Sequence, residues 1–211
     1  MGDKIRCVLV LGGPQEEWIH EAPPLQADDF IIACDSGYPG ALQCGWNPQM
    51  AVGDFDSYCG AVASGVQKIS VPPEKDDTDA SLGAKLALER GLRNFLIVGA
   101  LGGRLDHTIA NLQMLSWLKA QGAEAQIYSA KSRIWVLQEE AFFLPKMEGW
   151  YLSVFAWGGP CQVTLKGVAY PLTDYQMIPT FPIGVSNEFT EETAQIRVTN
   201  GTLLVIASRK E

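Results

Sequence analysis

The chain has little of what a histidine- or cysteine-based metal centre requires. Its 211 residues include only two histidines, His20 and His107. The five cysteines are an odd number, form no C-x-x-C pair and stand mostly in apolar or glycine-rich surroundings. These features predict buried, reduced thiols and argue against a zinc site, so any metal ion is expected to be held by oxygen.

Long apolar runs and concentrated positive charge are also missing. No run approaches the roughly 18 to 20 residues that a membrane-spanning helix needs, and the residues from Met1 to Arg6 lack the features of a signal peptide. The formal net charge is -8 and the pI is about 4.8. This balance argues against general binding to nucleic acid or anionic membranes. We therefore expect a cytoplasmic protein.

The first 130 residues alternate apolar runs with helical patterns. The runs at residues 6–11, 30–34, 50–52, 66–71, 94–98 and 125–129 are largely apolar throughout, which favours strands buried on both faces of a parallel sheet. Apolar residues at helical spacing predict helices over 78–90 and 106–121, closed by Gly91 and Gly122. This alternation predicts an α/β domain with a doubly wound, mostly parallel sheet.

The pattern changes after about residue 130. Short strand-like runs follow at 134–137, 142–144, 150–156, 162–165, 193–198 and 203–207, separated by turn residues. The pair Asn200 and Gly201 between two alternating runs predicts a β-hairpin. We therefore expect two domains, an α/β domain over 1–130 and a C-terminal antiparallel β-sandwich over 131–211.

The first group of candidate functional residues follows the run at 50–52. Asp54 and Asp56 are separated by one residue, so in an extended segment their carboxylates point to the same side. At the carboxyl end of a strand they are well placed to share Mg²⁺. An ordinary polar turn, in which each aspartate bonds to nearby backbone N–H groups, explains this segment equally well.

A second group, residues 74–79, directly precedes the first predicted helix. Thr78 and the aspartates of this segment are favoured helix caps, and carboxylates stabilise the positive end of a helix. One such residue is enough for capping. Asp76, Asp77 and Asp79 together exceed that need and repel one another, unless a metal ion or cationic group lies among them.

The third group, residues 99–107, lies between a predicted strand and a helix. Its glycines let a phosphate approach the backbone, and Arg104 can contact phosphate oxygens in a bidentate manner. The glycine spacing matches neither the P-loop nor the dinucleotide fingerprint. Asp106 is also a candidate N-cap of the helix, and His107 an ordinary first-turn residue.

Position connects these groups. Asp35 and the segments 53–57, 75–79 and 102–107 each follow an apolar strand, and the carboxyl ends of the strands of a doubly wound sheet lie along one edge, where ligands bind. Carboxylates gathered with Lys75 and Arg104 suit a magnesium nucleotide, because the metal offsets the repulsion between ligand and protein. The sequence therefore predicts a magnesium-nucleotide site.

Five ordered segments together resemble the thiamine pyrophosphokinase family. They are 33–37 (ACDSG), 52–57 (VGDFDS), 75–79 (KDDTD), 102–107 (GGRLDH) with its 110–112 (ANL), and 184–189 (GVSNEF). The resemblance implies an N-terminal α/β domain and a C-terminal β-sandwich, a homodimer with thiamine bound near the dimer interface, and transfer of the diphosphate of Mg-ATP to thiamine with release of AMP.

The resemblance also implies roles for individual residues. Asp54, Asp56 and Asp79 are expected to be the catalytic, Mg²⁺-binding set, whereas Asp77 becomes a solvated residue at the helix start. The residues expected to surround ATP are Asp35, Ser57, Lys75, Asp76, Thr78, Arg104, Asp106, His107 and Asn111. The residues expected to contact thiamine are Ser186, Asn187 and Phe189, with Trp157 as an alternative aromatic partner of the thiamine rings.

The chain departs from the family pattern at Ser36, at Tyr38-Pro39 and over residues 170–182. Two other functions remain open at this point. A related diphosphokinase acting on a pterin alcohol is disfavoured by Ser186-Asn187, which match the thiamine enzymes. A non-catalytic nucleotide-binding regulator has no need of three metal-binding carboxylates, so Asp54, Asp56 and Asp79 disfavour it.

Overall fold

The computed structural model describes residues 5–54, 61–70 and 78–210. The chain divides into two compact units, Met1–Ala130 and Lys131–Glu211. Among the described residues, no helix has the length and apolar character needed to cross a membrane. Each unit has its own cluster of buried apolar residues, and each is described by itself below.

The N-terminal unit is built on a parallel sheet. Its strands are β1 (Arg6–Val10), β2 (Phe30–Cys34), β3 (Met50–Gly53), β4 (Gln67–Ser70), β5 (Asn94–Val98) and β6 (Glu124–Tyr128). They lie in the order β6-β5-β1-β2-β3-β4, and each neighbouring pair is parallel. Because β2 and β5 flank β1 on opposite sides, the strand order reverses there, and the carboxyl ends at such a point form a crevice for ligands.

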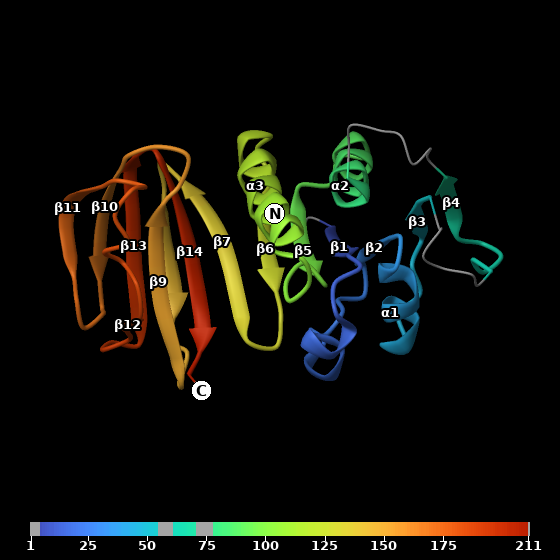
Figure 1. The fold of residues 1–211 in the computed structure, drawn as a ribbon, viewed down its shortest axis with the longest axis horizontal. Helices are drawn as coiled ribbons and strands as arrows, with labels where there is room; N and C mark the ends of the chain where they lie inside the picture. Colours follow the sequence, from blue (N-terminus) through green and yellow to red (C-terminus); the bar gives the residue numbers. More distant parts are fainter. Residues whose placement is uncertain (1–4, 55–60, 71–77, 211) are drawn as a thin grey trace. The chain divides into compact units, whose positions relative to one another are not determined.

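Helices cover both faces of this sheet (Figure 1). They are α1 (Gly37–Gln43), α2 (Asp79–Glu89) and α3 (Leu105–Ala120), with two short 3-10 helices, η1 (Gln15–Glu17) and η2 (Ile19–Glu21). Successive side chains of β1 point to opposite faces of the sheet. Val8 and Val10 share a core cluster with Trp18 and Tyr38, whereas Leu9 lies beneath Gly83 of α2.

The C-terminal unit is a sandwich of two antiparallel sheets. One contains β7 (Ser132–Gln138), β9 (Trp150–Ala156), β12 (Asn187–Glu188) and β14 (Thr202–Arg209), in the order β12-β9-β14-β7. The other contains β8 (Ala141–Pro145), β10 (Cys161–Lys166), β11 (Leu172–Met177) and β13 (Thr193–Asn200), in the order β11-β10-β13-β8. Val154 and Val205 of the first sheet share one buried cluster with Leu165 and Ile196 of the second. The predicted fold class, α/β followed by an antiparallel sandwich, is confirmed.

The Asn200-Gly201 turn does not form the predicted hairpin. Gly201 has a φ of +79°, as a tight turn of this kind requires, but β13 pairs with β8 and β10 while β14 pairs with β7 and β9. The turn therefore carries the chain from one sheet to the other. Both strands have an apolar inner face that enters the same core, and the burial of those two faces against each other decides the pairing.

Candidate active site

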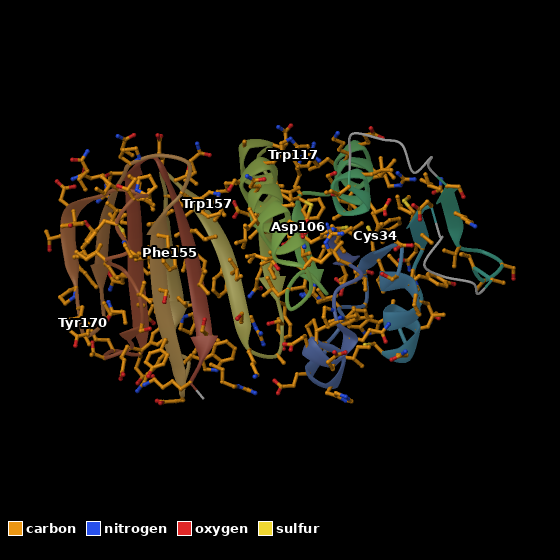
Figure 2. All side chains as sticks on the ribbon, in the orientation of Figure 1. Cys34, Asp106, Trp117, Phe155, Trp157 and Tyr170 are labelled. Atoms are coloured by element: carbon orange, nitrogen blue, oxygen red, sulfur yellow. The ribbon has the colours of Figure 1, made fainter. Side chains whose placement is uncertain are left out.

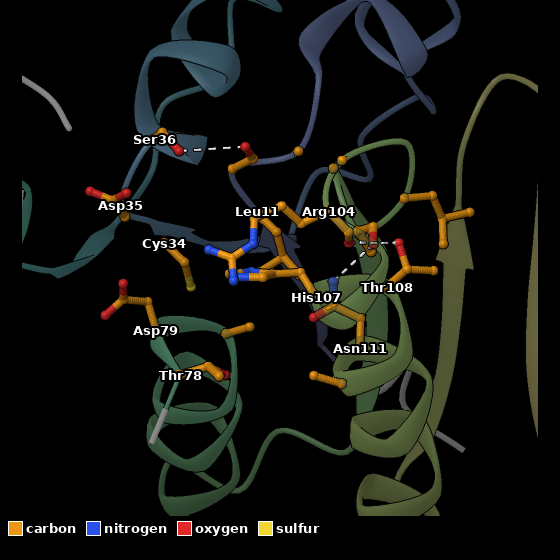
Figure 3. Close-up of a pocket in the computed structure, with 18 of the residues that line it drawn as sticks. Leu11, Cys34, Asp35, Ser36, Thr78, Asp79, Arg104, His107, Thr108 and Asn111 are labelled. Carbon is orange, nitrogen blue, oxygen red and sulfur yellow. Dashed lines mark hydrogen bonds between the residues drawn. The ribbon is translucent and has the colours of Figure 1, made fainter. Parts of the chain in front are cut away.

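A cavity of about 500 Å³ lies at the carboxyl edge of the parallel sheet (Figure 3). Its walls come from the loop after β1, the ends of β2 and β5, and the first turns of α2 and α3. Six residues predicted for the ATP and magnesium site line it: Asp35, Thr78, Asp79, Arg104, His107 and Asn111. Asp35 and Asn111, which are 76 positions apart in the sequence, thus share one hollow because parallel strands end at one edge of the sheet.

Asp35 enters the cavity through an unusual backbone conformation. Its φ is +45°, in the left-handed region that few residues other than glycine adopt. Two hydrogen bonds hold it there: its N–H donates to the Val52 carbonyl over 2.8 Å, and its carbonyl accepts from Tyr38 N–H over 3.1 Å. Oδ1 of its carboxylate is buried without a hydrogen-bond partner among the described residues. A backbone held away from its preferred conformation is common at functional sites.

Gly53, at the end of β3, packs directly against Asp35. A Cβ atom at Gly53 would lie 3.1 Å from the Asp35 Cα, and its φ of +154° also favours glycine. Asp54, which is half-buried, directly follows Gly53 in the chain. Although Asp54 is a described residue, it does not line the cavity.

The start of α2 contributes Thr78 and Asp79. The Thr78 hydroxyl accepts a hydrogen bond from Ser81 N–H over 3.1 Å, so Thr78 is the N-cap of the helix. Asp79 is the first helical residue, where a carboxylate is favoured by the helix dipole. Figure 3 shows Asp79 and Asp35 on the same side of the cavity. The capping interpretation of Thr78 is correct. The cap fixes the first turn of α2, to which Asp79 belongs.

The loops after β1 and β5 interlock through glycines. Gly13 N–H donates to the Gly99 carbonyl over 2.9 Å. Gly99 has a φ of +68°, and a Cβ atom there would clash with the Leu11 carbonyl oxygen. Asn111 of α3 fixes the same loop, since its Nδ2 donates to the Ala100 carbonyl over 2.8 Å. The glycines therefore let the two loops pack closely against each other, and the hydrogen bonds fix their backbone at the edge of the cavity.

Arg104 and Asp106 form an exposed ion pair at the start of α3. Arg104 Nη2 lies 2.6 Å from Asp106 Oδ2, and its Nε donates to Oδ1 over 3.2 Å. The hydrogen bond from Arg104 lowers the pKa of Asp106. The helix begins at Leu105 and its N-cap position is Arg104, so Asp106 is not the N-cap. Its carboxylate instead accepts from His107 N–H over 3.0 Å.

Of the residues predicted for the ATP and magnesium site that the structure describes, Asp54 and Asp106 do not line the cavity. Asp106 pairs with Arg104 without lining the hollow, and Asp56, Ser57, Lys75 and Asp76 lie outside the described residues. Within the described ranges, no group of three or more His, Cys, Asp or Glu side chains is arranged to hold a metal ion. Two members of the predicted magnesium set, Asp54 and Asp79, are described.

The sequence analysis missed part of the cavity wall. Leu11, Gly12, Gly13 and Pro14 line it after β1, as does Ser36, whose hydroxyl donates to the Gly12 carbonyl over 3.5 Å. The signal was present, because two glycines after an apolar strand are the same pattern that marked residues 99–103. Cys34 also lines the cavity; it is buried and forms no disulfide among the described residues, as is true of Cys7 and Cys161.

The residues predicted to contact thiamine lie in the C-terminal unit. Ser186 is exposed with a φ of +57°, whereas Asn187 is buried within β12. Phe189 is half-buried and packs against the sandwich core. Trp157, the alternative aromatic residue, is half-buried at the end of β9.

The fold and the site together define an α/β enzyme class in which loops at the carboxyl edge of a doubly wound sheet form a ligand site, and a β-sandwich follows in the same chain. Comparison with known proteins identifies the family within this class. Residues 24–127 match the thiamin pyrophosphokinase catalytic domain, and residues 134–203 match the thiamin pyrophosphokinase vitamin B1 binding domain.

Individual relatives agree over nearly the whole chain. The thiamine pyrophosphokinase of Bacillus subtilis is 27% identical over 207 residues, covering 95% of this chain and 97% of the relative. The crystal structure of that enzyme superposes with a TM-score of 0.90 over 98% of this chain and 100% of the other, at 24% identity. A thiamin pyrophosphokinase family protein of Enterococcus faecalis is 30% identical, with a TM-score of 0.82 over 98% and 100% of the two chains.

The chain belongs to the thiamin pyrophosphokinase family and is an enzyme. The resemblance predicted from its five ordered segments is confirmed.

Proposed function

We propose that this enzyme transfers the diphosphate group of Mg-ATP to the hydroxyl of thiamine, giving thiamine diphosphate and AMP. In this proposal residues 1–130 bind ATP and magnesium and carry the chemistry, and residues 131–211 bind thiamine. Both family matches, one to a catalytic domain and one to a vitamin B1 binding domain, support this division.

The observation that carries the proposal is the cavity at the carboxyl edge. Asp35, Thr78, Asp79, Arg104, His107 and Asn111 come from separate parts of the sequence and line one hollow. Residues of the glycine-rich loops line the same hollow, and the Arg104 guanidinium can donate two hydrogen bonds to phosphate oxygens.

The residues present fit a magnesium ion. Mg²⁺ prefers carboxylate oxygens, substrate phosphates and water. The cavity offers carboxylates from Asp35 and Asp79, and Oδ1 of Asp35 is a buried acceptor with no hydrogen-bond partner in the described part of the chain. We propose that Asp54, Asp56 and Asp79 hold the ion and that Asp35 lines the same site. When bound, the ion offsets the charge of the triphosphate and polarises its phosphoryl oxygens.

The chain's own residues bind and orient the reactants. Arg104 exchanges its contact with Asp106 for the nucleotide phosphates, while Lys75, Asp76, Ser57 and His107 complete the ATP site. The thiamine hydroxyl oxygen bonds to the β-phosphorus, the bond between that phosphorus and the α,β-bridging oxygen breaks, and AMP leaves. An aspartate of the site accepts the hydroxyl proton.

A homodimer and a cytoplasmic location complete the proposal. Phe181, Ile183 and Val185 are exposed apolar residues directly before Ser186, and an exposed apolar segment of this kind is typical of an interaction surface. Light scattering on the purified protein tests the dimer, and a monomeric mass at working concentration would contradict it. The cysteines of the described residues form no disulfide, which supports a reducing compartment.

Turnover of Mg-ATP and thiamine tests the reaction. The purified protein is incubated with both, and the products are separated by chromatography; we expect AMP and thiamine diphosphate in equal amounts. ADP in place of AMP would indicate transfer of a single phosphoryl group and overturn the proposal. A pterin alcohol in place of thiamine should give no product.

Asp54→Asn tests the metal assignment. Loss of one carboxylate ligand should reduce turnover by about a hundredfold or more, since a metal ion supplies several kcal/mol of transition-state stabilisation. The exposed Asp28 provides the matched control, and Asp28→Asn should retain full activity. Near-normal AMP release by Asp54→Asn, with a far-UV circular dichroism spectrum like that of the unmodified protein, would refute the role of Asp54.

A further inference from the structure

Tyr38 is a buried tyrosine in the N-terminal unit that has no part in the proposed reaction so far. It lies in the first turn of α1 and is completely buried. Burying a phenol hydroxyl is costly unless it is hydrogen-bonded. The bonds that Tyr38 makes therefore indicate what it contributes beyond the packing of α1.

The backbone of Tyr38 holds Asp35. Strand β2 ends at Cys34 (Figure 2), and Asp35 follows it directly. The Tyr38 N–H donates to the Asp35 carbonyl over 3.1 Å, which closes a turn between β2 and α1. Asp35 has a φ of +45°, and a backbone in that region persists only where its surroundings hold it. Tyr38 therefore helps to keep the Asp35 carboxylate in the cavity.

The side chain of Tyr38 holds a different part of the chain. Its hydroxyl oxygen accepts a hydrogen bond from the Ala63 N–H over 3.0 Å. Val62 and Val66, on either side of Ala63, pack against the apolar cluster that contains Tyr38. This stretch of backbone is therefore held against α1 by a hydrogen bond and by apolar contacts.

Ala63 is the far end of the stretch of chain that begins at Asp54. At the near end, Gly53 packs against Asp35, and Asp54 comes next. The turn from Asp35 to Tyr38 thus contacts both ends of residues 54–63, the Asp54 segment. A chain segment that is held at both ends has fewer conformations, so less entropy is lost when its side chains bind a metal ion.

We propose that Tyr38 is a positioning residue for the magnesium site, and that it fixes Asp35 and the Asp54 segment relative to each other. This inference rests on the proposed function, which assigns magnesium binding to Asp54 and places Asp35 in the same site. Tyr38 is buried and does not line the cavity, so it acts through the backbone that it holds. Mg²⁺ demands nearly regular octahedral geometry, and a small displacement of one carboxylate therefore weakens its binding.

Hydrogen exchange without any ligand tests the contact between Tyr38 and Ala63. Tyr38→Phe removes the hydroxyl oxygen and keeps the ring in the core. In the full-length protein, followed by NMR, exchange of the Ala63 amide should become about tenfold faster, while the Val98 amide of β5 is unchanged. Tyr175→Phe is the matched control, because it removes a phenol oxygen from β11 of the C-terminal unit. Unchanged exchange at Ala63 in Tyr38→Phe would overturn the inference.

Binding of Mn²⁺ alone tests the effect on the metal site without turnover, since Mn²⁺ prefers the same oxygen ligands as Mg²⁺. Free Mn²⁺ is measured by electron paramagnetic resonance during a titration of the protein. The Kd should rise about five- to tenfold in Tyr38→Phe and stay within about twofold in Tyr175→Phe. Asp54→Asn should abolish this binding, which identifies the site.

Ala63→Pro tests the same hydrogen bond from its donor side. It deletes the N–H at an exposed position, so it remains informative even if the buried Tyr38→Phe variant does not accumulate. We expect its Kd for Mn²⁺ to rise by a factor similar to that in Tyr38→Phe. An unchanged Kd in either variant, or no Mn²⁺ binding to the unmodified protein, would overturn the inference.

Steady-state kinetics distinguish positioning from a general loss of structure. In Tyr38→Phe the free Mg²⁺ concentration that gives the half-maximal rate should rise about five- to tenfold, while KM for thiamine stays within about twofold. Destabilisation alone would lower the maximal rate and leave the Mg²⁺ dependence unchanged, and that result would overturn the inference. Failure of the proposed function is separate, because the unmodified enzyme would then form no AMP from ATP and thiamine, whereas the Mn²⁺ titration would still report on Tyr38.

Discussion

The Asn111 side chain ties the second turn of α3 to the loop after β5 through its 2.8 Å bond to the Ala100 carbonyl. Gly99, at the start of that loop, bonds to Gly13 of the loop after β1. One amide therefore secures two walls of the cavity. The family resemblance identified Asn111 as a candidate ligand of ATP, whereas its hydrogen-bond partner is defined by tertiary contact.

Asn111→Ala should weaken ATP binding and lower stability. The Ala100 carbonyl loses its partner, and an unsatisfied buried acceptor costs roughly 1–3 kcal/mol. We expect KM for ATP to rise several-fold and the urea midpoint to fall. The exposed Gln113 lies on the same helix, and Gln113→Ala is the matched control. Equal behaviour of the two variants would contradict a positioning role for Asn111.

Arg104→Met should raise the pKa of Asp106. Arg104 donates to this carboxylate and lowers its pKa, so the ion pair persists to a lower pH than an isolated aspartate would allow and is lost as the pH falls through the lowered pKa. Carbon-13 NMR titration of the Asp106 carboxyl group in both proteins measures the change. An unchanged titration midpoint would show that the ion pair is not populated in solution.

Among the secondary structure elements, α2 matches its prediction closely and α1 was missed. The capping residue, the apolar spacing and Gly91 mark α2 locally. Helix α1 contains Gly37, Pro39 and Gly40, which are poor helix formers, so no local signal predicts it. It forms because Tyr38 and Ala41 are completely buried against the sheet, and this packing outweighs the weak propensity.

Thr78→Ala should destabilise α2. The Thr78 hydroxyl satisfies the Ser81 N–H, and removal of an N-cap side chain costs about 1 kcal/mol. Thr78→Ser keeps the hydroxyl and should retain most of this stability. Urea unfolding followed by circular dichroism compares the three proteins. A loss in the serine variant as large as that in the alanine variant would indicate that the threonine methyl group, and not the cap, is responsible.

At the scale of the whole molecule, each unit depends on its own core. Leu165 is 1% exposed in the middle of the sandwich, among residues of both sheets. Its neighbours come from strands that are distant in sequence, which is why the sequence indicated an apolar position without revealing what packs on it. The two apolar faces meet only when both sheets have formed.

Leu165→Ala should lower the free energy of unfolding by roughly 2–5 kcal/mol, because it removes buried methyl groups and leaves a cavity. Leu105 is 73% exposed and gives the matched control. Leu105→Ala deletes the same side-chain atoms, but at a position that faces solvent. Thermal unfolding measures both. Similar melting temperatures for the two variants would refute the assignment of Leu165 to the core.

The sequence by itself determined the fold class, the change from α/β to β structure near residue 130, most strands of both units and the family. These features are local, because the hydrophobic period, the turn residues and the ordered motifs can each be recognised within short segments of the sequence. Position after strands, together with the family resemblance, also identified six residues of the cavity. Only the tertiary structure decided which strands pair across the Asn200-Gly201 turn, that the loop after β1 lines the cavity, and that Tyr38 holds both Asp35 and Ala63. Those outcomes depend on contacts between residues distant in sequence, which the packing of the folded chain selects.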